Sequence, residues 1–481
     1  MPRERTAYVL SLGCPKNLVD SEVMLGHLAQ DGYVPVQDPD GADVVVVNTC
    51  AFIDSAKEES VDAILELSEL KRARPDVRLV VAGCLSQRYA PDLAQEIPEV
   101  DHFLGTGNFE QITGVLRGET PAPGGRSGLK ILGQGSPDAA TTSVRPSMAE
   151  PAGPVTALPD PDFTLRATSP RLQSNATHTA YLKVSEGCSN TCAFCIIPKL
   201  RGDQRSRPVE DVVAEAARLL EQGVVELNLI AQDLCAYGRD LSPKSSLGGL
   251  LEALDQLAQR YPGPIWIRCL YAYPKGLTRR VMEVMAGSRH IVPYLDMPLQ
   301  HIADPILRRM RRGTGGPATR DLIGRLRDTI PNLTLRTTFI TGLPGETDQD
   351  FEEVLDFCRE ARFENLGVFA YSPEEDTPAA DMDDQVPAEV AQSRRDALMA
   401  LQQEISRAHQ ASLVGTRVDV LVEGVSEETE LLLRGRHPGQ APDIDGVTYI
   451  TDGTANVGEV VPVVIEQSAD YDLAGPITQA E

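Results

Sequence analysis

The chain has 481 residues, which is too long for a single ordinary hydrophobic core, so its length predicts two to four domains. Its 45 Lys and Arg against 70 Asp and Glu give a net charge of −25, which disfavours nucleic-acid backbones and favours a basic partner. It has no signal-like start and no run of roughly 18 apolar residues, so we expect a cytoplasmic protein without a membrane span. Its nine cysteines, an odd number, favour metal ligation over a disulfide framework.

The first 118 residues predict a small parallel α/β domain. Strand-like runs at 7–14, 43–50 and 78–84 are each followed by an amphipathic segment. Residues 119–177 are then mostly Pro, Gly, Ser, Ala and Thr and predict a flexible linker.

Beyond the linker, alternating strand and helix patterns predict a partial (β/α)6 barrel over residues 178–412, ending in a long helix at 387–411. The six expected strands are 179–186, 225–233, 265–272, 294–300, 334–342 and 365–372. Residues 413–481 change to short β-rich runs between Gly and Asp, which predict a small C-terminal β-barrel. The expected fold class is therefore α/β with an added β-barrel.

Cys14, Cys50 and Cys84 each close one of the first three predicted strands, in SLGCPKN, NTCAFI and AGCLSQR. The carboxyl ends of parallel strands share one edge of a sheet, so we expect these cysteines to converge. Three thiolates predict an iron–sulfur cluster with one iron lacking a protein ligand. The alternative is three small buried cysteines, which are common in cores.

Cys188, Cys192 and Cys195 lie in one loop directly after the first predicted barrel strand, spaced C-x-x-x-C-x-x-C. Three cysteines leave one iron of a four-iron cluster open to a cofactor or substrate. A zinc knuckle is the alternative, but no fourth Cys or His follows at ligand spacing. The remaining cysteines, Cys235, Cys269 and Cys358, predict core positions, with Cys235 the least certain because it lies near a strand end.

The motifs SLGCPKNLVDSE, YLKVSEGCSNTCAFCIIPKLRGDQRSRP, DMPLQHIADPILRRMRRG and TTFITGLPGET resemble the radical S-adenosylmethionine (SAM) methylthiotransferases. The resemblance covers nearly the whole chain apart from the linker. It is strongest to the RimO branch, which modifies an aspartate of small-subunit ribosomal protein S-twelve. APDIDGVTYI and DYDLAG in the C-terminal domain resemble the TRAM domain of that branch.

This resemblance implies two 4Fe-4S clusters and SAM as cofactors, with both cysteine sets as metal ligands and catalytic groups. It implies that the cluster of Cys188, Cys192 and Cys195 generates a radical from SAM. The cluster of Cys14, Cys50 and Cys84 would handle the sulfur and the methyl group of a second SAM.

The resemblance also suggests four SAM contacts, namely Phe194, Gln232, Ile340 and Gly342. Core packing is the alternative for Phe194. Gln232 lies in Ala-Gln-Asp, where radical SAM enzymes often have Gly-Gly-Glu, so the cofactor contacts at this position are open.

The predicted partners are the basic ribosomal protein and an electron donor. Residues 413–481 contain three Arg and thirteen Asp or Glu, which disfavours direct RNA binding, although a merely solvated acidic face gives the same composition. We expect Asp443 and Asp445 of this domain to contact the protein substrate.

Two other functions remain open. A MiaB-type tRNA methylthiotransferase would use the same clusters, but its first motif usually has Gln-Met where this chain has Pro15 and Lys16. A non-catalytic iron–sulfur scaffold would need neither six barrel strands nor an adenine site. Cleavage of SAM separates that scaffold from both enzymes.

Overall fold

The structure, a computed structural model, describes residues 4–119, 155–158, 161, 163–174, 176–427, 429 and 431–478. The chain divides into two compact units, and each is considered by itself. Unit 1 is Met1–Ser174 with Glu186–Ser189 and Ile196–Arg205, and unit 2 is Asn175–Ser185, Asn190–Cys195 and Ser206–Glu481. Most of the predicted linker, residues 120–154, 159, 160, 162 and 175, lies outside the described residues.

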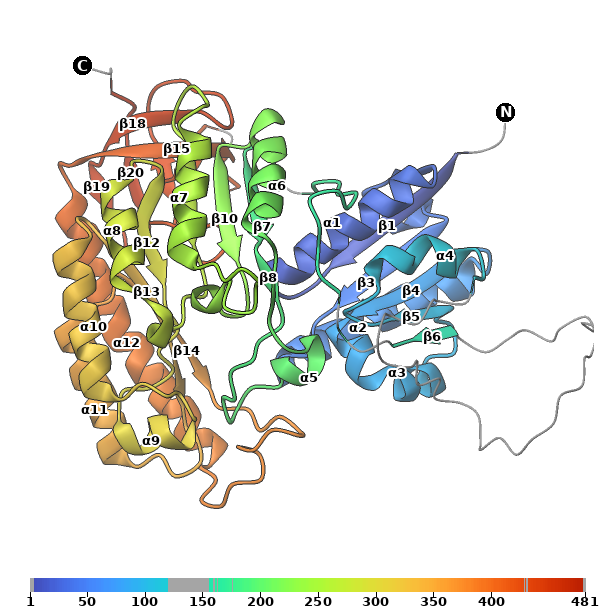
Figure 1. Cartoon of the computed structure of the whole chain (residues 1–481), viewed down its shortest axis with the longest axis horizontal. Helices are drawn as coiled ribbons and strands as arrows, with labels where there is room; N and C mark the ends of the chain where they lie inside the picture. Colours follow the sequence, from blue (N-terminus) through green and yellow to red (C-terminus); the bar gives the residue numbers. More distant parts are fainter. Residues whose placement is uncertain are drawn as a thin grey trace, which may run out of the picture. The chain divides into compact units, whose positions relative to one another are not determined.

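Unit 1 is built on a six-stranded parallel sheet with the order β2-β1-β3-β4-β5-β6 (Figure 1). Its strands are β1 (Arg5–Ser11), β2 (Tyr33–Pro35), β3 (Val44–Thr49), β4 (Arg78–Gly83), β5 (His102–Leu104) and β6 (Val155–Ala157). Its helices are α1 (Pro15–Gln30), α2 (Asp54–Ala73), α3 (Cys84–Glu96), α4 (Ile112–Leu116) and α5 (Ile197–Arg201). The three longest strands match the sequence prediction, whereas β2, β5 and β6 were not predicted.

Both faces of this sheet are covered by helices. In β3, Val45 and Val47 lie on the face of the sheet that α2, α3 and α5 cover. Val44 and Val46 lie on the opposite face, which α1 and α4 cover. Side chains of a strand alternate between faces, so a run of four valines supplies two hydrophobic cores at once. The predicted parallel α/β domain is confirmed.

Unit 2 contains a second six-stranded parallel sheet, with the order β14-β13-β12-β11-β10-β7. Its strands are β7 (Thr179–Lys183), β10 (Glu226–Ile230), β11 (Trp266–Cys269), β12 (Ile291–Asp296), β13 (Thr334–Thr341) and β14 (Asn365–Ala370). Its helices are α6 (Val209–Glu221), α7 (Leu247–Ala258), α8 (Arg279–Gly287), α9 (Asp304–Arg309), α10 (Gly316–Thr329), α11 (Asp348–Ala361) and α12 (Ala388–Leu413). Two short strands, β8 (Ser185–Glu186) and β9 (Arg205–Ser206), lie where the chain passes between the units.

The strand order of this sheet follows the sequence from β7 to β14, as in a partial barrel. All six predicted strands are present, each somewhat shorter than predicted or shifted by a few residues, and α12 matches the predicted long helix. The partial (β/α)6 barrel is therefore confirmed.

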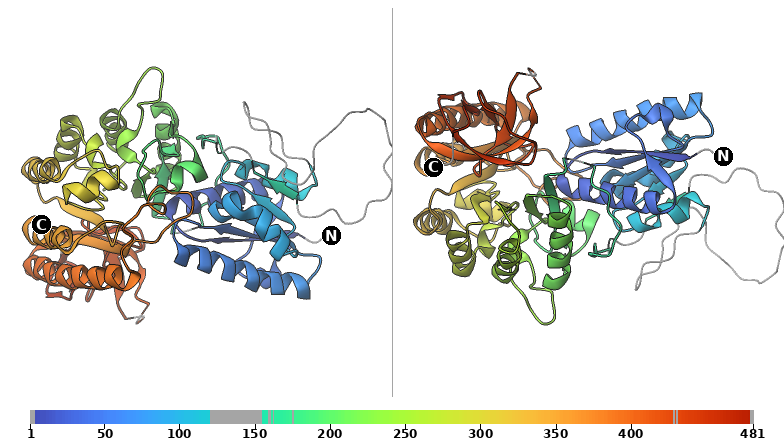
Figure 2. Two further views of the ribbon diagram at one scale, coloured as in Figure 1. Left: turned by 90° about the horizontal axis from the view of Figure 1, so that it is seen from below. Right: turned by 90° about the horizontal axis from the view of Figure 1, so that it is seen from above.

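The C-terminal part of unit 2 is a curled six-stranded sheet, drawn in red in Figure 2, with the order β18-β15-β16-β17-β20-β19. Its strands are β15 (Arg417–Val425), β16 (Leu433–Arg436), β17 (Thr448–Ile450), β18 (Val460–Val464), β19 (Gln467–Ser468) and β20 (Leu473–Gly475). After β20 the backbone returns to β18, where Val464 N–H donates to Pro476 O at 3.2 Å and Thr478 N–H donates to Pro462 O at 2.9 Å. These bonds curl the sheet towards the barrel that the sequence predicted.

In the described part of the chain, no helix has both the length and the apolar character needed to cross a membrane.

Candidate iron–sulfur sites

The first three cysteines lie at the carboxyl ends of three neighbouring strands of unit 1. Cys14 caps α1 after β1, Cys50 follows β3, and Cys84 begins α3 after β4. Gly13 has φ +84°, and a Cβ there would lie 2.9 Å from the Sγ of Cys50, so the loop carrying Cys14 runs against Cys50. The sheet therefore brings together the three loops, as the sequence predicted.

Asn17 holds these loops in place. Its Nδ2 donates to Leu12 O at 3.0 Å, in the loop after β1, and to Thr49 O at 2.8 Å, at the end of β3. The Sγ of Cys84 lies 4.0 Å from Asn17 Oδ1. One buried amide thus contacts all three loops.

The Arg201 guanidinium lies at the same place and is 2% exposed. Its Nη2 donates to Asn17 Oδ1 at 2.5 Å, and its Nη1 donates to Asp20 Oδ2 at 3.0 Å and to Glu186 Oε1 at 3.1 Å. Burial lowers the pKa of Arg201, but the facing Cys84, Glu186 and Asp20 raise it well above its usual value. Arg201 is therefore a fixed positive charge beside the cysteines.

The pKa values of the thiols also reflect this proximity. Burial, together with the neighbouring Cys84 and Cys14 thiols, raises the pKa of Cys50 to about 12. Burial likewise raises the pKa of Cys84, Arg201 opposes that rise, and Cys14 adds to it. Iron binds the thiolate, so a cluster held by these cysteines would have to displace protons from buried thiols.

The donor set fits a cluster better than a single ion. In the described ranges, no three His, Cys, Asp or Glu side chains are grouped to hold one metal ion. A cluster makes a different demand, because each thiolate binds a different iron and the three sulfurs stand farther apart. Three converging thiols beside a buried cation meet that demand.

The second cysteine loop crosses between the units. Cys188 belongs to unit 1, where it is buried and its N–H donates to Gly202 O at 3.0 Å. Cys192 and Cys195 belong to unit 2, where a turn joins them through a 3.2 Å bond from Cys195 N–H to Cys192 O.

Within unit 2, Arg312 contacts the sulfur of Cys192. Its Nη1 donates to Cys192 Sγ at 3.5 Å and its Nη2 donates to Pro298 O at 2.6 Å. The guanidinium stacks on Tyr273, with Cζ 4.0 Å from the ring centroid. A second cysteine loop is thus also held by a buried arginine.

Asp233 anchors the start of the same loop. It accepts from Asn190 Nδ2 at 2.7 Å and from Ala236 N–H at 3.1 Å. Burial raises the pKa of Asp233, whereas the bond from Asn190 lowers it. In this chain, the Asp of the Ala-Gln-Asp sequence is therefore engaged with the cysteine loop.

Phe194 and Ile340, both predicted SAM contacts, are packed against one apolar cluster of unit 2. The buried members of this cluster are Ala193, Ala303, Ile306, Met310, Leu343 and Ala379. Gly342, at φ +78°, has a structural reason to be glycine, because a Cβ would lie 2.2 Å from that of Ala391 in α12. Gln232 is half-buried just beyond β10. Phe194 thus lies in the cysteine loop, and the other three residues lie at or just beyond the carboxyl ends of barrel strands. The contact of all four with SAM stays a prediction.

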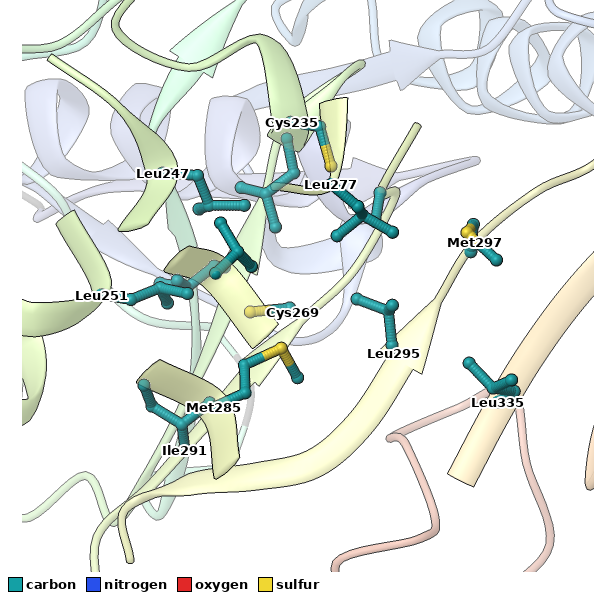
Figure 3. Close-up of a cluster of buried hydrophobic side chains, with 14 of the residues drawn as sticks. Cys235, Leu247, Leu251, Cys269, Leu277, Met285, Ile291, Leu295, Met297 and Leu335 are labelled. Atoms are coloured by element: carbon teal, nitrogen blue, oxygen red, sulfur yellow. The ribbon is translucent and has the colours of Figure 1, made fainter. Parts of the chain in front are cut away.

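The other cysteines are part of the barrel core, as predicted. Cys235, Cys269 and Cys358 are buried at 5%, 0% and 0% exposure within one hydrophobic cluster. Figure 3 shows Cys235 and Cys269 among leucine, isoleucine and methionine side chains.

The expectation for Asp445 is wrong. Its carboxylate is 1% exposed and accepts from Tyr294 Oη at 2.7 Å, from Arg336 Nη1 at 3.0 Å and from Ala441 N–H at 2.8 Å. Asp443 is an exposed residue, and its carboxylate accepts from Tyr181 Oη at 3.2 Å. These aspartates stabilise the packing of the C-terminal sheet on the barrel within unit 2.

Sequence reasoning assigned no role to Arg201, Arg312, Asn17 or Asp233. The first three occur within motifs that carried the resemblance, so their position in those motifs was the available signal. Their contacts with the cysteine loops depend on tertiary structure.

Three family models match the chain, in the order of its parts. They are an uncharacterized protein family (UPF0004) over residues 6–105, the radical SAM superfamily over 182–358 and the TRAM domain over 414–477. The fold and these matches define a radical SAM enzyme with an N-terminal α/β domain and a C-terminal TRAM domain.

Similarity to curated proteins extends over almost the whole chain. The chain is 54% identical over 470 residues to the ribosomal protein uS12 methylthiotransferase RimO of Anaeromyxobacter sp. strain K, covering 98% of this chain and 92% of that protein. It is 49% identical over 475 residues to the protein of the same name from Myxococcus xanthus strain DK1622, covering 99% and 92%. The chain therefore belongs to the RimO family of radical SAM methylthiotransferases.

Among solved structures, the radical SAM methyltransferase TsrM from Kitasatospora setae, with cobalamin and a 4Fe-4S cluster bound, is similar in fold. The TM-score is 0.53 at 16% identity, over 78% of this chain and 74% of that one. This likeness supports the fold, and the cofactors of this family are 4Fe-4S clusters and SAM.

Proposed function

We propose that this chain attaches a methylthio group to the β-carbon of an aspartate in ribosomal protein uS12. The observation that carries the proposal is identity of about half the residues, over nearly the whole chain, to proteins named for that reaction. The proposed reaction takes place in the cytoplasm, where ribosomes assemble, and requires an electron donor.

The β-carbon of an aspartate carries C–H bonds that ordinary side-chain bases do not deprotonate. A four-iron cluster with one open iron, together with SAM, supplies the radical chemistry that such a carbon requires. We assign the two ligand sets as Cys188, Cys192, Cys195 and Cys14, Cys50, Cys84. This assignment is supported by the loop spacing of the first set and by the convergence of the second at one sheet edge.

The chain's other residues hold the ligands in place. Arg312 and the Asn190–Asp233 pair fix the barrel loop at two points, and Asn17 fixes the three loops of unit 1. When the protein holds the cysteine ligands in place, it also sets where the iron without a protein ligand would lie. Phe194 and Ile340 contribute an apolar surface of the kind on which an adenine ring packs.

The charge of the C-terminal sheet supports a protein substrate over RNA. Of its three arginines, Arg436 is buried against Glu226 and Glu423, and Arg434 lies 2.7 Å from Glu427. Pairing leaves the acidic excess of this domain uncompensated, which favours a strongly basic partner.

The test is reconstitution of the purified protein with iron and sulfide, followed by separate incubations with SAM, a reductant and either uS12 or tRNA. We expect mass spectrometry to find one added methylthio group on an aspartate of uS12. An unmodified uS12 together with a methylthiolated tRNA would overturn the proposal in favour of the MiaB-type reaction. Absence of SAM cleavage would leave only the scaffold role.

A further inference from the structure

A short segment of unit 1, Leu200 to Gly202, contacts both cysteine sets. Leu200 packs in the hydrophobic core beside α2 and α3, and its carbonyl accepts from Thr106 Oγ1 at 2.6 Å. Arg201 points to the N-terminal cysteines, while Gly202 O accepts the N–H of Cys188 at 3.0 Å. The core packing of this segment therefore fixes where the Arg201 charge lies.

The charges around Arg201 have been removed from water. Arg201 and Asp20 are 2% exposed and Glu186 is 5% exposed at the side chain. The interaction between charges is far stronger in such surroundings than in solution, and it is little screened by salt. The positive charge of Arg201 and the negative charge of Asp20 must therefore both act on the neighbouring thiolates.

Reduction of an iron–sulfur cluster adds one negative charge. Hydrogen bonds to the sulfurs, the net local charge and solvent exposure set how readily that charge is accepted. A cation held beside Cys84 makes reduction easier, and an anion held behind that cation makes it harder.

We propose that Arg201 is a positioning residue that raises the reduction potential of the cluster held by Cys14, Cys50 and Cys84, and that Asp20 opposes it. The inference rests on the ligand assignment made above. The balance of Arg201 against Asp20 and its second buried partner, Glu186, sets the cluster's electron affinity separately from that of the barrel cluster. The N-terminal cluster then keeps a reduction potential suited to sulfur handling rather than to SAM cleavage.

The experiment measures the potential of the N-terminal cluster alone. The full-length chain carrying Cys188→Ala, Cys192→Ala and Cys195→Ala is reconstituted and titrated with a reductant and redox mediators, and the reduced cluster is followed by electron paramagnetic resonance. Into this background we introduce Arg201→Gln, Arg201→Lys or Asp20→Asn, one at a time.

We expect Arg201→Gln to lower the potential by at least a tenfold change in the reduced-to-oxidised ratio, about 59 mV for a one-electron couple. Asp20→Asn, which keeps an acceptor for Arg201, should raise the potential. Arg201→Lys keeps the charge and should shift the potential less than Gln does. Shifts of the potential in opposite directions are not expected if Arg201 and Asp20, which are in contact, only maintain the fold.

Arg171→Gln is the matched control, because it removes another arginine of unit 1 whose side chain is buried and pairs with Glu22 at 2.6 Å. It should leave the potential unchanged. A bound cluster whose potential stays the same in Arg201→Gln and Asp20→Asn would overturn the inference alone. If Arg201→Gln does not retain iron, the sign of the Asp20→Asn shift decides the matter. A parent background that binds no cluster would overturn the ligand assignment, and this inference with it.

Discussion

The two sets of three cysteines, proposed as cluster ligands, come together in different ways. In unit 1, three cysteines far apart in sequence meet because three adjacent parallel strands end at one edge. In the barrel loop, three cysteines within eight residues are close because the chain is short between them. Each site nevertheless has a buried arginine at a cysteine, Arg201 near Cys84 and Arg312 on Cys192.

The arginines differ in their partners. Arg201 is paired with two buried carboxylates, so its single positive charge is more than balanced within the protein. Arg312 binds a backbone carbonyl and stacks on Tyr273, so its described contacts include no carboxylate that balances its charge. The positive charge of Arg201 is therefore offset by nearby carboxylates, whereas the described contacts of Arg312 leave its positive charge beside the Cys192 sulfur without such an offset.

The largest expected effect is the loss of SAM cleavage when the barrel-loop cysteines are replaced. Replacing Cys188, Cys192 and Cys195 with Ala should lower bound iron to about one cluster and reduce SAM cleavage to background, because radical generation needs the cluster with the SAM-binding iron. Iron analysis and the yield of deoxyadenosine measure both effects. Deoxyadenosine production at the parent rate would show that this loop does not bind the radical-generating cluster.

The converse substitution should give the opposite pattern. With Cys14, Cys50 and Cys84 replaced by Ala, we expect SAM cleavage to persist while methylthiolated uS12 is lost. Mass spectrometry of uS12 and deoxyadenosine analysis on the same sample measure the two activities. Full product from this variant would show that Cys14, Cys50 and Cys84 are not needed for sulfur handling and would end the division of roles between the two cysteine sets.

The patterns visible in the sequence were those with strong local signals. Four consecutive valines before Asn48 predict β3, and a cysteine at each strand end predicts the convergence in unit 1. Strands β2 and β5 have only three residues, too few for a periodic pattern to be recognised.

Tertiary contacts explain what sequence reasoning missed. The acidic loop around Asp445 has the composition of a solvated surface, yet Tyr294 and Arg336 from the barrel bury its carboxylate. Arg201 follows an apolar stretch in a basic motif, and only folding of α5 against α3 brings it to Cys84. A charge and its partner that are 181 residues apart, such as Arg201 and Asp20, leave no periodic trace in the sequence.

A moderate effect is expected at Arg312. Arg312→Gln should reduce SAM cleavage by roughly tenfold to a hundredfold, because a hydrogen bond from a charged group contributes about 1.5–3 kcal/mol and each 1.4 kcal/mol is about a factor of ten. Arg312→Lys should retain part of the rate. Arg320→Gln, which removes an arginine stacked on Phe357 at 4.7 Å, is the control for loss of an aromatic stack. Equal losses in the Arg312 and Arg320 variants would indicate that Arg312 serves packing rather than the sulfur of Cys192.

The smallest expected effect is a loss of stability of unit 2 in acid. Burial, followed by Arg268, His409 and Arg436, lowers the pKa of His437 in unit 2 to about 3. The pKa of the same residue in the unfolded chain is about 6.5. The unfolded state therefore binds more protons below about pH 6.5, so the stability that neutral His437 contributes is complete above that pH and is lost as pH falls towards 3.

Trp266, the chain's single tryptophan, is buried in β11 and reports the unfolding of unit 2. Urea unfolding followed by its fluorescence should show a loss of up to about 2 kcal/mol between pH of about 6.5 and 5 from this histidine. His437→Gln should reduce that loss, because Gln accepts the Gly439 N–H bond without titrating. His102→Gln in unit 1, where burial also lowers the histidine pKa, should leave the Trp266 transition unchanged. If His437→Gln and the parent lose equal stability in acid, the carboxylates of unit 2 rather than His437 account for its acid sensitivity.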